Sequence, residues 1–257
     1  MKLSDGSLVA VLAALAVALA GAALSARLRI RLERSIAVAL GRALVQLTIV
    51  ALVVDAVFAN LGLTGLFLLV MLAAAAVTSA RRLSPLPNAL PIAAASIALP
   101  AAAALAPIFA TQSVPVTPRY VLPLTGIVLG NAMIVTSLAG RRLRDELSAR
   151  FGEIEARLAL GFSPRQAIRP LRREAVTTAL LPVIDQTKNV GLVTLPGAFV
   201  GMLLGGATPL EAAVVQFVVL AVLIGAGVGA AVTVGWMIRR LVETPDGRVV
   251  LPEPLRN

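Results

Sequence analysis

Long apolar stretches separated by short polar connections run through the whole chain. A helix needs about 20 largely apolar residues to cross roughly 30 Å of hydrocarbon, and the chain offers such a stretch repeatedly. We expect helices over residues 8–26, 36–58, 63–80, 90–110, 120–140, 180–205 and 213–238. The pattern therefore predicts an all-α, polytopic integral membrane protein with about seven transmembrane helices.

Two of these stretches have a second interpretation. The first follows Lys2 and ends in small residues, as a signal peptide does, but four arginines follow it, so we interpret it as a retained helix. The stretch over 90–110 contains Pro91, Pro100 and Pro107, which favours a kinked or partly re-entrant helix.

Basic residues gather in alternate connections. Of the 23 Lys and Arg residues, 19 lie in the connections 27–35, 81–89, 141–179 and 239–257. Because cytoplasmic connections carry the excess of Lys and Arg, this asymmetry predicts an N-terminus outside and a C-terminus in the cytoplasm.

Composition supports a membrane domain and excludes several function classes. Hydrophobic residues make up 58% of the 257, charged residues only 14%, and mean hydropathy is +0.92. The net charge of +10 is explained by the connections, so we do not expect nucleic-acid binding. Cys and His are absent, which excludes disulfides, zinc sites of the usual kind and His-based catalytic triads. We expect one membrane domain over 1–257 with no catalytic residues and one long cytoplasmic segment, 141–179.

That cytoplasmic segment predicts a helix, a turn and a second helix. Its apolar residues recur at helical spacing among many charges, at Leu143, Leu147, Phe151, Ile154 and Leu158. After them, Gly161 suits a helix C-terminus, Ser163 an N-cap and Pro164 the first position of a short new helix. A solvated basic loop, or an anchor on anionic membrane lipid, is the alternative interpretation.

The segment also carries a resemblance. Glu155-Ala156 followed by Gly161 looks like the loop through which bacterial ABC permeases dock on their ATPase subunits. With Ser163-Pro164, with GRALVQL at 41–47, with RYVLPLTGIVLGNAM at 119–133 and with NVGLVTLPGAFVGMLLGGATPLEAAVVQ at 189–216, the chain resembles the Fet-type iron-export ABC permeases, the FetB family.

The resemblance implies a permease of the bacterial plasma (inner) membrane that dimerises and exports a metal ion, iron in the family, or a related small solute. It implies a separate ABC ATPase subunit that binds ATP and Mg, contacted through Glu155, Ala156, Gly161, Ser163, Pro164 and Arg165. The sequence independently lacks a Walker A motif, and its only lysines are Lys2 and Lys188, so we expect no cofactor in this chain.

Ionisable and polar residues inside predicted spans are costly and mark candidate positions of a transport pathway. The candidates are Arg42, Gln46, Asn131, Asp185, Gln186, Lys188 and Asn189. Four of them have a structural alternative: Arg42 can snorkel to the interface, Asn131 can bond a neighbouring helix, and Asp185 and Lys188 can pair at i and i+3. Asp55 lies near the outer end of its span.

Small residues in the 190–206 region predict close helix packing, or a subunit interface, at Gly191, Pro196, Gly197, Gly201 and Gly205. Here the chain also departs from the family, because it has IDQTKN where the family is rich in Met and Asn. Soft thioether ligands are lost, so the identity of the metal stays open.

Two other functions are compatible with parts of the sequence. A proton-coupled secondary transporter could use Asp185 and Asp55 as its carboxylates. A membrane enzyme acting on lipids would need a Ser-Lys arrangement, and Lys188 has no Ser near it on its own helix.

Overall fold

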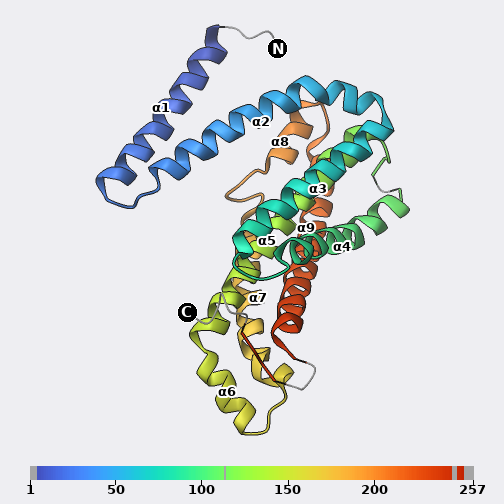
Figure 1. The fold of residues 1–257 in the computed structure, drawn as a ribbon. Coiled ribbons are helices and arrows are strands. Elements are labelled where there is room, and N and C mark those ends of the chain that lie inside the picture. Colours follow the sequence, from blue (N-terminus) through green and yellow to red (C-terminus); the bar gives the residue numbers. More distant parts are fainter. Residues whose placement is uncertain (1–4, 113, 245–247, 252–257) are drawn as a thin grey trace. The chain divides into compact units, whose positions relative to one another are not determined.

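The computed structural model describes residues 5–112, 114–244 and 248–251. Within these ranges the chain forms nine α-helices and no named strand, only two isolated β-bridges (Figure 1). The prediction of an all-α fold is confirmed. The chain divides into two compact units, residues 1–59 and 60–257, and each is described by itself.

The first unit consists of α1 (Asp5–Arg27) and α2 (Glu33–Ala59). The turn between them is fixed by Ser25, whose hydroxyl oxygen accepts a hydrogen bond of 3.1 Å from the backbone N–H of Leu32. Arg29 and Arg31 adopt positive φ angles in this turn, at 56° and 62°. The two helices are therefore joined by a tight, basic connection.

The second unit is built around one long helix, α5 (Pro118–Ala149). It packs against α3 (Leu61–Leu83), α4 (Ala89–Ala110), α7 (Pro164–Asn189) and α9 (Pro209–Val242). The short helices α6 (Phe151–Ala159) and α8 (Gly197–Leu204) pack on α7 and α9 respectively. Three of the helices begin at residues whose side chains bond the first turn: Asn60, Ser163 and Thr208.

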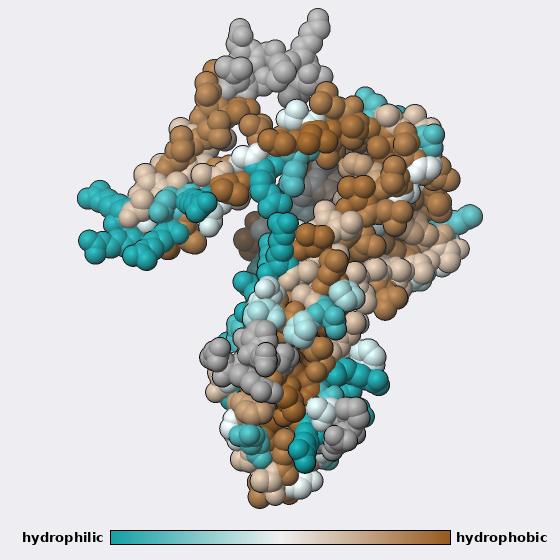
Figure 2. All heavy atoms as spheres, in the orientation of Figure 1, coloured by the Kyte–Doolittle hydropathy of each residue, from teal (hydrophilic) through white to brown (hydrophobic). Residues whose placement is uncertain are grey.

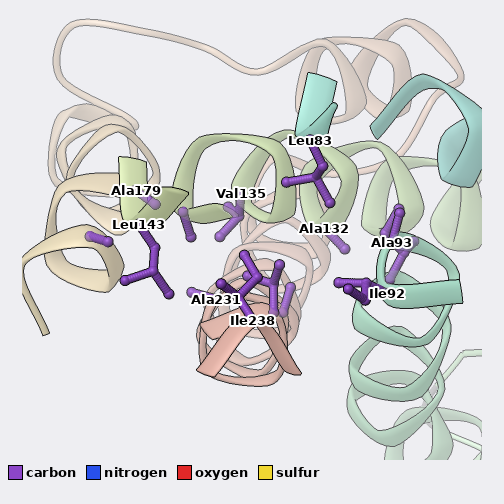
Figure 3. Close-up of a cluster of buried hydrophobic side chains, with 14 of the residues drawn as sticks. Leu83, Ile92, Ala93, Ala132, Val135, Leu143, Ala179, Ala231 and Ile238 are labelled. Carbon is purple, nitrogen blue, oxygen red and sulfur yellow. The ribbon is translucent and has the colours of Figure 1, made fainter. Parts of the chain in front are cut away.

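Small residues let these helices approach one another closely. Ala132 and Ala231 are buried in the same cluster as the larger Leu83 and Ile238 (Figure 3). The contact is tightest at Gly140, where an added Cβ would lie 2.2 Å from Leu83 Cδ2 and 3.2 Å from Val234 Cγ2. Packing of this kind, rather than bulk apolarity, holds helices together where the surroundings are as apolar as the helices themselves.

Six of the described helices, α1 to α5 and α9, are long and apolar enough to cross a membrane. The predicted continuous helix over 180–205 is wrong. Helix α7 ends at Asn189 and α8 begins only at Gly197, because the intervening segment contains Gly191, with a φ of +87°, and Pro196. Helix α7 is also too highly charged in its first half to count as a span by composition. The N-out orientation stays a prediction.

Helix α4 matches the predicted stretch over 90–110 and continues through Pro100 and Pro107 as one helix, while a kink in it stays a prediction. Pro100 is buried, and an added Cβ at Gly229 would lie 2.7 Å from it.

Two features of the cytoplasmic segment differ from the sequence-based predictions. The helix predicted through Leu143 to Leu158 is divided at Arg150 into α5 and α6. The helix that begins at Pro164 is not short, because it runs for 26 residues.

The surface of the second unit differs between its two ends. Figure 2 shows apolar side chains over the part formed by α3 and α4, and hydrophilic side chains mixed with apolar ones around α6 and the first half of α7. The charged end is therefore the part of this unit suited to water, and the apolar part is suited to lipid.

Candidate functional site

The turn between α6 and α7 has the geometry that the sequence predicts. Gly161 adopts a φ of +87°, and its backbone N–H bonds the Leu158 carbonyl at 3.0 Å, which ends α6. Ser163 caps α7 in a reciprocal arrangement: its N–H donates to Gln166 Oε1 at 2.9 Å, and its hydroxyl oxygen accepts from the Gln166 N–H at 3.4 Å. Pro164 occupies the first turn of α7.

The apolar faces of α5, α6 and α7 are buried against one another beneath this turn. Leu147, Ile154, Ile168 and Leu171 have no exposed surface. A guanidinium nitrogen of Arg157 in α6 also donates to the Ala167 carbonyl of α7, at 3.1 Å. The three helices are thus packed as one element at the charged end of the unit.

Ion pairs tie the same three helices together on their outer side. Arg150, at the break between α5 and α6, pairs with Glu146, Glu153 and Glu174, at 3.3, 2.6 and 3.2 Å. Arg142 also reaches Glu174, at 3.2 Å, so α5 holds α7 through two arginines. The Glu146 and Glu153 partners were foreseeable from their spacing of i−4 and i+3 relative to Arg150, whereas Glu174 is distant in sequence and nothing in the sequence indicated it.

The hydrogen bonds from Arg150 to Glu153 and Glu146 raise the pKa of its guanidinium above its ordinary value. Because the pKa is higher in the folded chain than in the unfolded chain, the charged guanidinium stabilises the fold. This stabilisation is fully present at pH values below the unfolded-state pKa and is lost as pH rises through the folded-state pKa. Both values lie far above neutrality, so Arg150 stays charged throughout the physiological range.

The tip of this element is exposed and partly apolar. Leu160 is 78% exposed and Phe162 is 48% exposed, on either side of Gly161. Glu155 and Arg165 are exposed beside them, and neither makes an ion pair within the described residues. An apolar pair with a charge on each side is a surface suited to a protein partner.

A basic cavity adjoins the tip. It has a volume of about 490 Å³ and is lined by Ser163, Arg165, Gln166, Arg169 and Arg172. Arg172 is partly buried, its stem packed against Gly235, and burial lowers the pKa of its guanidinium, with further lowering by the charges of Arg239, Arg165 and Arg169. The first turns of α7 therefore carry concentrated positive charge, which suits an anionic partner surface or anionic lipid.

The predicted ion pair at the end of α7 is confirmed. Lys188 Nζ lies 3.2 Å from Asp185 Oδ1, and both side chains are more than half exposed. Asn189 donates through Nδ2 to the Asp185 carbonyl at 2.9 Å, and Gln186 is exposed. The four polar residues thus lie together at one helix end, and their role in a pathway stays a prediction.

The other pathway candidates lie elsewhere. Asn131 donates through Nδ2 to the Leu223 carbonyl at 2.9 Å, which joins α5 to α9 and matches the structural alternative of an interhelical bond. Arg42 and Gln46 lie one turn apart on α2 and belong to the first unit. The structure therefore brings together the candidates of the sixth predicted span, whereas Asn131 bonds to α9.

The small residues of the predicted packing face have free space around them. An added Cβ at Gly191, Gly197 or Gly201 would meet nothing within 4 Å, and at Gly205 only carbonyl oxygens of its own helix. Pro196 is the N-cap of α8. Within the described chain no neighbouring helix packs closely against these glycines. Close packing of this face, which would then be against a second molecule at a subunit interface, stays a prediction.

Gln216 was not among the sequence-based candidates and is buried, with 5% of its surface exposed. Its Oε1 atom has no hydrogen-bond partner among the described residues. A single Gln in an apolar helix was the only signal available in the sequence. Among the described residues, no group of three or more Asp or Glu side chains lies together in a way that could hold a metal ion.

The chain matches known proteins over most of its length. The family model described as "Uncharacterised protein family (UPF0014)" matches residues 8–242. The "UPF0014 membrane protein STAR2" of Oryza sativa subsp. japonica is 38% identical over 216 residues, covering 83% of this chain and 76% of the relative. "Protein ALUMINUM SENSITIVE 3" of Arabidopsis thaliana is 35% identical over 223 residues, covering 86% and 82%.

A bacterial relative bears a transport name. The "Probable iron export permease protein FetB" of Escherichia coli (strain K12) is 33% identical over 190 residues, covering 73% of each chain. No solved structure matches this chain. The extent of these matches, together with six helices able to span a membrane, shows that the chain is a multi-pass membrane protein of the UPF0014 family.

Proposed function

We propose that this chain is the membrane-spanning permease subunit of an ABC transporter of the bacterial plasma (inner) membrane. The permease acts as a homodimer embedded in membrane lipid, as one domain over 1–257, and a separate ATPase subunit binds ATP and Mg. Its cargo is a metal ion, iron by resemblance, or a related small solute, and it moves outward.

The proposal rests mainly on the tip between α6 and α7, at Leu160 to Phe162, which buried packing and ion pairs hold against α5. An ATPase that closes on ATP can move the spans only through an element that does not deform, and α5, α6 and α7 are joined by buried apolar packing and by the Arg142 and Arg150 ion pairs. Helix α5 runs without a break from Pro118 in the apolar part of the unit to Ala149, where α6 follows after Arg150. Motion at Leu160 and Phe162 would therefore reach the span through α6 and the ion pairs of Arg150.

The name of the Escherichia coli relative supports the cargo and the direction. The plant relatives in the same family bear other names, one of which refers to aluminium sensitivity. We therefore propose the metal as a class and rank iron first within it.

The alternative, a proton-coupled secondary transporter, depends on Asp185. That carboxylate is already paired with Lys188 of its own helix at 3.2 Å, and its side chain is more than half exposed, whereas a proton-carrying carboxylate is expected inside a helix bundle. The permease is the better supported of the two.

The energy source distinguishes these functions. Inverted membrane vesicles containing this chain and its proposed ABC ATPase partner are incubated with radioactive ferrous iron in the external medium, with manganese as a parallel cargo. We expect uptake that requires ATP and survives a protonophore. Uptake driven by a proton gradient in the absence of ATP would contradict the proposal and support the secondary transporter.

A further inference from the structure

A second cavity lies in the apolar part of the second unit, between the end of α7, the 190–196 segment, α8 and the first turns of α9. Its volume of about 360 Å³ lies within the range of pockets that hold small molecules. Four apolar side chains, Leu195, Phe199, Phe217 and Leu220, form much of its wall. This cavity shares no lining residue with the basic cavity at the tip of α6 and α7.

One polar side chain in the wall lacks a partner. Gln216 lines the cavity, is 5% exposed, and its Oε1 makes no hydrogen bond within the described residues. Leaving a buried acceptor unpaired costs about 1–3 kcal/mol, so nearly all such groups in proteins have a partner. The Oε1 atom is itself fully buried, so the carboxamide gains a partner in the cavity that it lines when the side chain turns this oxygen toward the cavity.

A second polar group is available beside it. The Thr187 hydroxyl lines the same cavity and donates to the Val183 carbonyl at 2.8 Å, so its oxygen can still accept a hydrogen bond. Every other lining residue is apolar or glycine, and none is charged. A charged occupant would lose its hydration without a counter-ion, whereas a neutral one with an apolar body loses little.

We propose that this cavity binds an uncharged, amphipathic small molecule that presents a hydroxyl group to Gln216. A hydroxyl both donates and accepts, so it satisfies the carboxamide in either orientation, while the apolar body packs against Phe199, Phe217 and Leu220. The site goes beyond the metal transport proposed above, because a bare cation would find two neutral oxygens and an apolar wall here.

Two matched probes test the site on the purified chain, with no ATPase present. 4-Fluorophenol carries the hydroxyl, 4-fluoroanisole replaces its proton by a methyl group, and ¹⁹F saturation transfer reports the binding of each in the same detergent. We expect wild type to bind the phenol about five- to tenfold more tightly, the ratio that one net hydrogen bond provides. Gln216→Leu should keep the anisole affinity and lose the preference.

Two neighbouring variants locate the binding. Ala213 lines the cavity one helical turn before Gln216, so Ala213→Leu should weaken both probes by filling the space. Val214 is 57% exposed and does not line the cavity, so Val214→Leu should bind as wild type does. Equal binding of the two probes by wild type, or unchanged binding by Ala213→Leu, overturns the proposal even where Gln216→Leu fails to fold. Neither result affects the ATP-dependence test.

Discussion

At Gly161 the backbone reverses from α6 into α7 with a φ of +87°, a conformation that costs a side-chain-bearing residue free energy. We expect Gly161→Ala to destabilise this turn by about 1 kcal/mol and to reduce the amount of ATPase that co-purifies with the chain. The matched control is Gly152→Ala in α6, where φ is helical and an added Cβ meets nothing within 4 Å. Equal ATPase recovery from both variants would contradict the assigned role of the turn.

The pair at the end of α7 gives a second test at the residue scale. Lys188→Ala leaves the Asp185 carboxylate without its partner at 3.2 Å, so a negative charge at the end of α7 is no longer neutralised by its neighbour. We expect the rate of metal transport to change while ATPase co-purification stays the same, and Asp185→Asn in the same chain should bring the rate back toward that of wild type. Transport by Lys188→Ala at the wild-type rate would place the pair outside the pathway.

Sequence reasoning succeeded at residues whose environment is local. The roles of Gly161, Ser163 and Pro164 in the turn follow from backbone preferences within a few residues, and the Asp185–Lys188 pair follows from helical spacing. Sequence reasoning missed Glu174, which pairs with arginines at the end of α5, and Gln216, whose buried oxygen has no hydrogen-bond partner among the described residues. Both features depend on how separate helices pack, which local sequence does not show.

Among the elements, α5 is where close packing is most demanding. An added Cβ at Gly140 would lie 2.2 Å from Leu83 Cδ2, and Leu83 has no exposed surface and so cannot easily move. We expect Gly140→Ala to lower the free energy of unfolding by about 1–3 kcal/mol, as overpacking of a core does, and to shift the thermal midpoint of the purified chain downward.

The control for this change lies on the same helix. At Gly130 an added Cβ meets nothing within 4 Å, so Gly130→Ala should leave the midpoint unchanged or raise it through helix propensity. A loss of stability at Gly130 as large as that at Gly140 would show that helix packing around Leu83 is not the cause.

The element for which the sequence-based prediction was wrong is the sixth predicted span, 180–205. Its apolar length over 180–205 suggested one helix, but Gly191 and Pro196 end the helical backbone locally and leave α7 and α8 as separate helices. Hydropathy averages over such a segment and cannot register where the backbone turns. The remaining apolar helices were located correctly because length and composition alone define them.

For the whole molecule, the least tested feature is orientation across the membrane. Basic residues are in excess in alternate connections. This asymmetry predicts that the α6–α7 tip lies in the cytoplasm and that the α4–α5 connection lies outside. Since the chain contains no Cys, single cysteines can be introduced at Glu155 and Gln112 and labelled in intact cells with a membrane-impermeant maleimide. We expect label at position 112 and none at 155, and the reverse would require an inverted topology.

The central claim is that an ATPase engages this chain at the tip between α6 and α7. Phe162, 48% exposed, is replaced by Cys, and a bifunctional thiol–amine reagent is added to membranes containing both subunits; Thr178→Cys, exposed further along α7, is the control. We expect the Phe162 variant to cross-link to the ATPase, with a yield that changes between nucleotide-free and ATP-bound states, and the Thr178 variant to give little product. ATP-driven transport by a complex whose Phe162 position gives no cross-link in either state would contradict the account.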